Sequence, residues 1–301
     1  MIDVTASAPC RILAGLGDVA GRYDVVLCDV WGVVHDGRRA FPAAAEALTR
    51  FRAQGGTVVL LTNAPRPQAS VVSQLDGLGV PRAAYDGLVT SGDATVALIA
   101  DRGGRAAYHI GPPRDLALLD EVEAKTGRAP PLAPLAEADY CICTGLFDDA
   151  VETPEDYAGV LAAALARRLD MICANPDIVV HVGDRLIFCG GALAQRYAGM
   201  GGTVLYAGKP HAPIYRVALD VAAERRGALI AADRVLAIGD GLPTDIAGAR
   251  RQGLDALFVT TGIHREETLD AVTGAIDPDG LARLLGEAGE GPELAITHLV
   301  W

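Results

Sequence analysis

Apolar and polar residues follow one another in blocks along the chain, and these blocks predict strands and helices in turn. Short apolar runs bounded by turn residues predict strands at about residues 24–30, 57–62 and 87–90. The helices between them are predicted to begin near Pro42 and Pro67, since proline is well placed in a first helical turn. Strands that alternate with helices are typical of a parallel sheet with helices on its faces.

The same alternation continues through the middle and the end of the chain. Further strands are expected at residues 106–110, 139–144, 170–174, 203–206, 234–238 and 256–260. Further helices are expected at residues 153–169 and from Ala212 and Pro243 onward. Residues 177–193 indicate a strand, a Gly-Asp turn, a second strand and a helix, whereas residues 292–301 have no clear assignment.

The pattern predicts an α/β protein of two domains. A core with a doubly wound, Rossmann-like parallel sheet is expected from residues 1–91 and 196–301, and the strand at 203–206 is expected to return the chain to it. Residues 92–195 carry no complete catalytic set and are predicted to form an inserted α/β domain. A chain of 301 residues with 50% hydrophobic residues is large enough for two cores.

The charge and the apolar runs bear on partners and location. A net charge of -12 and a pI near 4.9 argue against nucleic acid as a partner, because nucleic-acid affinity depends on clustered Lys and Arg. No apolar run approaches the roughly 18 residues of a membrane span, and Met1–Thr5 lacks the basic start of a secretion signal. We expect a soluble, cytoplasmic protein that does not bind membranes.

The six cysteines are expected to be reduced thiols in the core. Most of them lie in apolar, strand-like settings such as Tyr140-Cys141-Ile142-Cys143, and free cysteine commonly behaves as a small buried apolar residue. A structural zinc site is disfavoured because no second Cys or His pair stands at the spacing of zinc ligands.

Four short segments at the ends of predicted strands hold the candidate chemistry. They are the segments around Asp29, Thr62-Asn63, Gly208-Lys209-Pro210, and residues 238–245 with Asp240 and Asp245. Ligands of an open α/β sheet bind beyond the carboxyl ends of its strands. We therefore expect these side chains to share one pocket.

Each of the first three segments also has a plainer explanation. Asp29 could be a nucleophile or a metal ligand, or an ordinary aspartate of a turn or helix cap. Thr62 could bind an anionic oxygen, or could cap the helix that follows. Lys209 is one of only two lysines in the chain, beside Lys125, which favours a required point charge over a solvated loop lysine.

The fourth segment favours a divalent cation. Carboxylates such as those of Asp240 and Asp245 are ligands that Mg²⁺ prefers. Gly239-Asp240-Gly241 also resembles a dinucleotide-binding loop, but Thr244 stands where the third glycine is needed and the carboxylate of Asp240 would repel a pyrophosphate. The dinucleotide interpretation is therefore disfavoured.

The order of the motifs resembles that of the haloacid dehalogenase superfamily. D-x-W-G-V, a strand-ending Thr, G-K-P and G-D-x-x-x-T-D-I follow one another as in its NagD-like, class IIA branch. That branch carries a large α/β cap of the C2 type between the second and third motifs. Residues 174–177 and 190–193 resemble the closing segments of such a cap, so the resemblance implies that residues 92–195 are the cap domain.

The resemblance also implies a role for each matching residue. The implied catalytic residues are Asp29, which would form an aspartyl-phosphate, and Thr62 and Lys209, which would hold the phosphoryl oxygens. The implied Mg²⁺ ligands are Asp29, the backbone carbonyl of Trp31, Asp240 and Asp245. The candidate substrate-binding residues are Asn63, Trp31 and His35.

Trp31 departs from the family pattern. Phosphatases of the superfamily usually have a second Asp at this position, which protonates the leaving group and later activates water. Positioned acid-base catalysis contributes about 10²- to 10⁴-fold, so its loss slows the hydrolysis of alkyl phosphates without necessarily abolishing it.

Three explanations of this departure stay open. Another group could supply the proton; the candidates are His35, Asp36, Asp148, Asp149, His181 and Asp184. The leaving group could be one that needs no proton, or the phosphoryl group could pass to another acceptor. For His35 the alternative is an exposed loop histidine without a role.

The sequence and the resemblance together favour a Mg²⁺-dependent phosphatase or phosphotransferase for a small phosphorylated metabolite. The alternative is a catalytically silent scaffold that binds a phosphorylated ligand or partner. Carbon-halogen hydrolysis is disfavoured because that reaction does not need the carboxylates of Asp240 and Asp245. A homodimer formed through the cap is the expected protein partnership.

Overall fold

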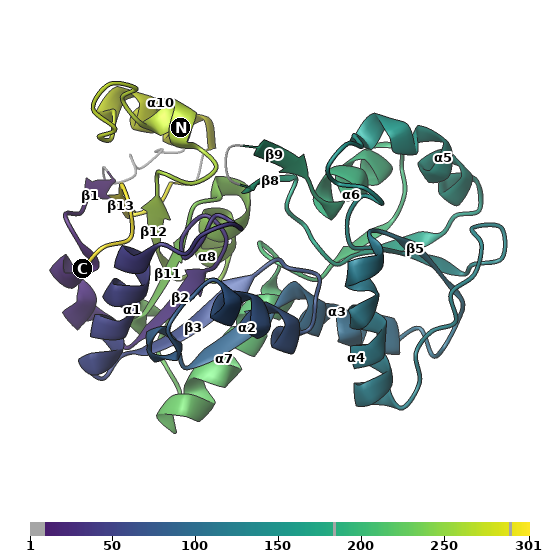
Figure 1. Cartoon of the computed structure of the whole chain (residues 1–301), viewed down its shortest axis with the longest axis horizontal. Coiled ribbons are helices and arrows are strands. Elements are labelled where there is room, and N and C mark those ends of the chain that lie inside the picture. Colours follow the sequence, from purple (N-terminus) through teal and green to yellow (C-terminus); the bar gives the residue numbers. More distant parts are fainter. Residues whose placement is uncertain (1–9, 183–184, 289–290) are drawn as a thin grey trace, which may run out of the picture. The chain divides into compact units, whose positions relative to one another are not determined.

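The computed structural model describes residues 10–182, 185–288 and 291–301 of the chain. The chain folds into two compact units (Figure 1). Most of a seven-stranded sheet belongs to the first unit, and a four-stranded sheet belongs to the second. The first unit consists of Met1–Leu60, Leu78–Gly87 and Ala218–Trp301, and the second consists of Leu61–Gly77 and Leu88–Val217. The domain boundaries expected at residues 92 and 195 remain a prediction.

The larger sheet has seven strands in the order β1-β13-β12-β11-β2-β3-β4. Their bounds are Arg11–Ile12 (β1), Leu294–Ile296 (β13), Asp255–Val259 (β12), Val235–Gly239 (β11), Val25–Asp29 (β2), Thr57–Thr62 (β3) and Gly87–Thr90 (β4). The pairs β1/β13, β13/β12, β12/β11 and β11/β2 are parallel. From β2 the chain builds outward through β3 and β4 on one side and through β11 and β12 on the other, so the winding reverses between β2 and β11.

The central strands of this sheet are buried because they are almost continuously apolar. Every residue of β2 and of β11 is buried, as expected for parallel strands with helices on both faces. The accompanying helices are α1 (Pro42–Ala53), α2 (Gln68–Gly77), α7 (Ala212–Arg226), α8 (Ala247–Arg251), α9 (Arg265–Thr268) and α10 (Pro278–Ala288). Helix α1 begins at its proline, as predicted. The predicted α/β fold with a doubly wound parallel sheet is confirmed.

The smaller sheet has four parallel strands in the order β10-β7-β6-β5. The strands are Ala107–Ile110 (β5), Tyr140–Cys143 (β6), Asp170–Cys173 (β7) and Val204–Tyr206 (β10). The helices of this unit include α3 (Ser91–Ala100), α4 (Ala117–Thr126), α5 (Ala158–Ala166) and α6 (Gly190–Gly199).

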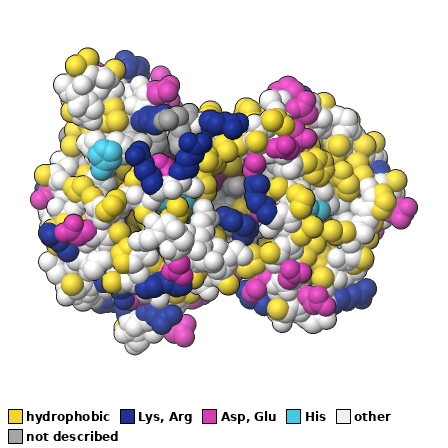
Figure 2. All heavy atoms as spheres, in the orientation of Figure 1, with side chains coloured by type: hydrophobic (Ala, Val, Ile, Leu, Met, Phe, Trp, Pro, Cys, Tyr) yellow, Lys and Arg dark blue, Asp and Glu magenta, His cyan; other side chains and the backbone are white. Residues whose placement is uncertain are grey.

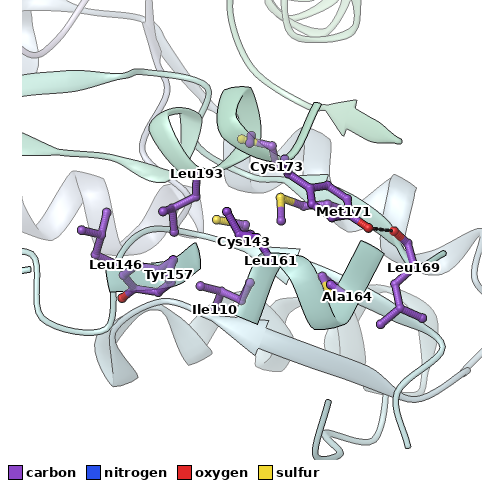
Figure 3. Packing of buried hydrophobic residues seen from close by; sticks show 13 residues of the cluster. Ile110, Cys143, Leu146, Tyr157, Leu161, Ala164, Leu169, Met171, Cys173 and Leu193 are labelled. Carbon is purple, nitrogen blue, oxygen red and sulfur yellow. Dashed lines mark hydrogen bonds between the residues drawn. The ribbon is translucent and has the colours of Figure 1, made fainter. Parts of the chain in front are cut away.

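One core of this unit is packed from strand and helix residues together (Figure 3). Cys143, Met171 and Cys173 come from the strands, and Leu161 and Leu193 from helices α5 and α6; all five are fully buried. As predicted for the cysteines, five of the six are buried, and none forms a disulfide.

The structure differs from the sequence prediction in three strands, one of which is the unpredicted two-residue strand β1. Residues 204–206 form the expected strand, but it pairs with β7 of the smaller sheet, so the prediction that it returns the chain to the larger sheet is wrong. The unassigned tail contains β13, which lies between β12 and β1. Three apolar residues are too few to predict a strand without the neighbouring strands that bury them.

The segment 177–193 forms a small hairpin followed by a helix, as predicted. Strands β8 (Val179–Val182) and β9 (Arg185–Phe188) are antiparallel, and α6 follows. Residues 183 and 184 of the expected turn lie outside the described residues.

The surface carries charged side chains of both signs. Figure 2 shows acidic and basic side chains on the same face, so the net charge of -12 does not make that face uniformly acidic. Among the described residues, no helix is both long and apolar enough to cross a membrane.

Candidate functional site

Asp29 lies at the carboxyl end of β2, beside the point where the winding of the larger sheet reverses. The four residues before it are buried and apolar, and Asp29 itself is 6% exposed. The nearest following α-helix begins only at Pro42, so Asp29 is not a helix cap. The strand therefore holds a carboxylate at the position where open α/β sheets bind ligands.

Asp240 and Asp245 lie beside Asp29 because β11 is the parallel neighbour of β2. Ile238 is in register with Cys28, and Asp240 follows the end of β11 directly. One carboxylate oxygen from each of Asp29, Asp240 and Asp245 can be chosen so that all three lie within 4.8 Å of one another. The structure thus brings together three of the four predicted metal ligands.

Backbone groups hold two of these carboxylates in place. Asp240 Oδ2 accepts a hydrogen bond of 2.8 Å from the Ile263 N–H, and Asp245 Oδ2 accepts one of 3.0 Å from the Gly241 N–H. Gly32 has a φ of +83°, and a Cβ on it would lie 2.2 Å from Asp240 Oδ2. The glycine of the D-x-W-G motif is therefore needed for the close approach of the backbone to Asp240.

The cluster fits a hard divalent cation. Three carboxylates at this separation repel one another, and a divalent cation bound among them would reduce that repulsion. Oxygen-only donors suit Mg²⁺, which commonly takes water and phosphate oxygens as its other ligands. The donor set at Asp29, Asp240 and Asp245 is therefore chemically suitable for the expected ion.

Trp31 and His35 form a compact loop after β2. The ring centroids lie 4.9 Å apart in an edge-on arrangement with an interplanar angle of 72°. The Gly37 N–H donates to His35 Nδ1 at 2.9 Å, and the Gly32 N–H donates to the His35 carbonyl at 2.8 Å. His35 is 1% exposed, so the alternative of an exposed loop histidine is wrong.

Asp36, another candidate proton donor, has a carboxylate that is hydrogen-bonded within the same loop. Its carboxylate accepts from the N–H groups of Arg38 and Arg39 at 2.9 and 2.8 Å and from the Arg39 guanidinium at 3.0 Å. Burial acts to raise the pKa of Asp36, but these donors outweigh it and hold the pKa below its usual value. Asp36 is therefore an anion at neutral pH.

In the second unit, Thr62, Asn63 and Lys209 come together. Asn63 Oδ1 accepts from the Lys209 N–H at 2.7 Å, and Asn63 Nδ2 donates to the Lys209 carbonyl at 3.2 Å. Lys209 Nζ donates to the carbonyl of Leu61 at 3.3 Å. Thr62 precedes α2 by six residues and does not cap it.

The two lysines of the chain differ in how deeply they are buried. Lys209 is 2% exposed, which contradicts the alternative of a solvated loop lysine. Lys125 has a side chain that is 47% exposed and pairs with Glu121 at 3.0 Å and Asp93 at 3.6 Å on the surface. Burying an ammonium costs free energy unless the group is paired or hydrogen-bonded. The burial of Lys209 is therefore a sign of a specific role rather than of a solvated loop.

Asn63 also contacts a segment that resembles the closing part of a cap. Its Nδ2 donates to Asp177 Oδ1 at 2.8 Å, and the Ser91 hydroxyl donates to the carbonyls of Asn63 and Ala174. These bonds tie the end of β3 to the chain that follows β7.

The sequence analysis missed a second group of polar residues, at the carboxyl end of the smaller sheet. Asp115 is 4% exposed, and Thr144 and His109 form a 3.0 Å hydrogen bond between Oγ1 and Nε2. Burial raises the pKa of Asp115 to about 6, against the opposing charges of Arg114 and Arg66 and a hydrogen bond from Thr144. An acidic residue soon after a predicted strand, as at Asp29, was the available signal.

The remaining candidate proton donors lie in this second unit. Asp148 accepts from the Ala150 N–H at 3.0 Å, and Asp149 forms an ion pair with Arg114. His181 lies on β8 and is partly exposed. Asp184 lies outside the described residues.

Comparisons with known proteins agree with the architecture. The family model of haloacid dehalogenase-like hydrolases matches residues 26–125, and a related HAD-hydrolase-like model matches residues 206–288. Among curated proteins, the chain is 27% identical to the ribonucleotide monophosphatase NagD of Escherichia coli over 82% of this chain and 91% of that protein. It is also 30% identical to the D-glycerol 3-phosphate phosphatase of Mycobacterium tuberculosis, over 82% of this chain and 65% of that protein.

A solved structure is more similar still. The crystal structure of a haloacid dehalogenase-like hydrolase from Brucella suis is 46% identical, with a TM-score of 0.83 over 97% of this chain and 100% of that chain. Identity at this level over the whole length, together with the two model matches, shows that this chain belongs to the haloacid dehalogenase-like family of hydrolases.

Proposed function

We propose that the protein is a Mg²⁺-dependent phosphatase or phosphotransferase for a small phosphorylated metabolite. The observation that carries the proposal is the cluster of Asp29, Asp240 and Asp245 at the reversal point of the larger sheet. The names of two relatives, a ribonucleotide monophosphatase and a glycerol 3-phosphate phosphatase, support phosphate esters as the substrates.

In the proposed reaction Asp29 is the nucleophile. One of its carboxylate oxygens attacks phosphorus, the bond from phosphorus to the leaving oxygen breaks, and an aspartyl-phosphate forms. Water or another acceptor then attacks phosphorus, and the carboxylate of Asp29 is released. A covalent intermediate divides one difficult displacement into two easier ones.

The other motif residues are proposed to bind the phosphoryl group. Thr62 would donate its hydroxyl, and Lys209 its ammonium, to phosphoryl oxygens, with Asn63 holding the lysine segment by the hydrogen bonds already described. Asp240, Asp245 and the carbonyl of Trp31 would hold Mg²⁺ with Asp29. The bound cation would neutralise charge that develops on the phosphoryl oxygens.

Substrate choice and assembly are proposed by analogy with the class IIA branch. Residues 92–195 would act as the cap that selects the substrate and excludes water, and a pair of chains would associate through that cap. We propose that the protein works in the cytoplasm, where phosphorylated metabolites occur.

The test uses the purified full chain with Mg²⁺ and an aryl phosphate. We expect turnover that requires Mg²⁺ and that falls by at least about 10³-fold in Asp29→Asn, because the amide cannot attack phosphorus. Asp36→Asn is the matched control, since Asp36 lies seven residues away and is bound by its own loop. Equal turnover in Asp29→Asn would exclude the proposed nucleophile.

A silent scaffold is the competing function, and Trp31 is the observation in its favour. The scaffold hypothesis predicts that phosphorylated metabolites bind in a Mg²⁺-dependent way, as measured by calorimetry, and that none of them is turned over. Turnover that depends on Asp29 would exclude it.

A further inference from the structure

We infer that Arg66 determines substrate specificity by binding a second anionic group of the substrate, a carboxylate or a further phosphate, apart from the phosphoryl group that is transferred. The inference rests on the proposed function and narrows its substrate class. It follows from the contrast between Arg66 and other partly buried arginines of the chain, and from the way the backbone around Arg66 is fixed.

Arg66 is partly buried, and its guanidinium is only partly paired. Among the described residues its one hydrogen-bond acceptor is the neutral amide of Gln74, whose Oε1 accepts from Nη2 at 2.8 Å. The Nε and Nη1 atoms of Arg66 are not among the buried atoms that lack a partner, so they remain open to solvent. Burial lowers the pKa of Arg66, which shows that its charge has lost part of its hydration. Such a charge is costly unless it is paired, so Arg66 is a cation prepared for an anionic partner.

Three other partly buried arginines have the carboxylate partner that Arg66 lacks. The side chains of Arg52, Arg102 and Arg226 are 27%, 18% and 26% exposed. In each of them a guanidinium nitrogen lies within 3.5 Å of an aspartate carboxylate oxygen. In the described part of the chain, no carboxylate lies at ion-pair distance from the Arg66 guanidinium. We therefore expect its partner to come from a ligand.

The charged groups that act on Arg66 do not replace that partner. Asp115 attracts the charge of Arg66, and Arg114 repels it. Asp115 is 4% exposed, accepts a hydrogen bond from Thr144, and has the Arg114 guanidinium 4.0 Å away. Arg114 also forms an ion pair with Asp149. A ligand would therefore meet the solvent-accessible donors of Arg66, whereas the carboxylate of Asp115 is shielded from it.

The backbone around Arg66 is fixed. Pro65 and Pro67 flank it, and Pro67 restricts the residue before it to an extended conformation. Thr90 Oγ1 donates to the Arg66 carbonyl at 2.8 Å. A Cβ on Gly92 would lie 2.5 Å from the Arg66 carbonyl oxygen, so the first turn of α3 packs directly on this segment. The base of the side chain is thus held in place, which reduces the ordering cost when the guanidinium binds a ligand.

Arg66 belongs to the segment that carries the proposed phosphoryl-binding residues. Thr62 precedes it by four residues, so the two Cα atoms are at most about 14 Å apart. Asn63, between them, is hydrogen-bonded to the Lys209 backbone. A small molecule can span this distance, with its phosphoryl group at Thr62 and Lys209 and a second anion at Arg66. The planar guanidinium suits such an anion, because it donates two parallel hydrogen bonds to the oxygens of a carboxylate or a phosphate.

The experiment compares kcat/KM within matched pairs of aryl phosphates in the presence of Mg²⁺. In one arm, phenyl phosphates with an ortho, meta or para carboxylate are compared with the corresponding carboxamides. In the other arm, a phosphonate stands for the second phosphate and is compared with its uncharged dimethyl ester. For the wild type we expect the charged member to be preferred by about 10- to 100-fold in at least one pair, the value of a charge-assisted hydrogen bond. The arm with the preference identifies the second anion as a carboxylate or a phosphate.

Variants of Arg66 assign the preference to its side chain. Arg66→Gln removes the charge and should bring the ratio of the two kcat/KM values close to one; a general loss of activity cancels in this ratio. Arg66→Lys keeps a charge without the planar pair of donors and should retain only part of the preference, which also covers the case that Arg66→Gln does not fold. Arg128→Gln, at an exposed position of the same unit, is the matched control and should keep the wild-type ratio. A preference that survives unchanged in the Arg66 variants would overturn the inference.

The outcomes separate the inference from the proposed function. Asp29-dependent turnover with equal kcat/KM values in every matched pair would overturn the inference alone. The absence of turnover with every compound would overturn the proposed function. Calorimetry with the same pairs would then test the anion site by itself: tighter binding of a charged member that Arg66→Gln abolishes would support it, and equal affinities would overturn it.

Discussion

The carboxyl ends of the two parallel sheets differ in how they treat buried charge. At the larger sheet, Asp29, Asp240 and Asp245 converge, and backbone N–H groups donate to the last two. At the smaller sheet, the buried Asp115 lies near the charges of Arg114 and Arg66 and near a second acid, Asp149. The first end gathers a donor set that suits a divalent cation. At the second end, burial outweighs the nearby arginines and raises the pKa of Asp115 to about 6. The same parallel arrangement therefore gathers three acidic side chains at one sheet and places a buried acid among basic side chains at the other.

The largest expected effect comes from replacing the buried lysine, Lys209, and comparing it with the exposed lysine, Lys125. Lys209→Met should lower kcat/KM for an aryl phosphate by about 10²- to 10³-fold, because it removes the buried ammonium that we propose to neutralise charge in the transition state. Lys125→Met, on the surface, should change it less than about twofold. Circular dichroism checks that both variants are folded, and similar kinetics of the two would contradict the proposed role of Lys209.

The next effect tests the buried carboxylate of Asp115 at the carboxyl end of the smaller sheet. The pKa of Asp115 is raised above its unfolded value, so the native state holds the proton more tightly and stability falls as pH rises from about 4 to about 6. Above that range the ionised, buried carboxylate costs up to about 3 kcal/mol. Asp115→Asn should therefore raise the free energy of unfolding at pH 8 and should weaken its pH dependence between pH 4 and 6.

Urea denaturation across that pH range gives the measurement. Asp120→Asn, at a surface position of α4, is the matched control and should keep the wild-type pH dependence. If Asp115→Asn is less stable than the wild type at pH 8, then the interactions of the carboxylate with Arg66 and Arg114 stabilise the native state by more than its burial costs.

The smallest effect compares both ends in one measurement of thermal stability. Mg²⁺ at about 100 times its dissociation constant should stabilise the native wild type by about 2.7 kcal/mol. Asp245→Asn should remove most of this stabilisation and should raise the Tm of the metal-free protein, because one of three repelling carboxylates is gone. Asp115→Asn should leave the Mg²⁺-induced increase in Tm unchanged. An equal loss in both variants would mean that the ion does not bind at the Asp29 cluster.

Much of the candidate site could be predicted because its residues end apolar strands. The run before Asp29 is so apolar that it must be a central strand, and parallel strands bring their carboxyl ends to one edge. Asp240 could be placed beside Asp29 for the same reason. The family motifs added roles that periodicity alone does not give.

Other features depend on partners that are distant in sequence. Strand β10 could have joined either sheet, and its pairing with β7 was decided by packing against the second core. The burial of His35 depends on the turn at Gly37 and on the ring of Trp31. The raised pKa of Asp115 depends on how deeply it is buried, which local sequence does not reveal.

The sequence by itself determined the alternating strands and helices, the family, and which side chains stand at strand ends, because these follow from local apolar patterns and short motifs. Only the tertiary structure decided which of those side chains meet. It brought three carboxylates within 4.8 Å, buried Lys209, and built Trp31 into the loop where an acid usually stands. Distances and burial depend on strand order and on packing between remote segments, and these are properties of the whole fold.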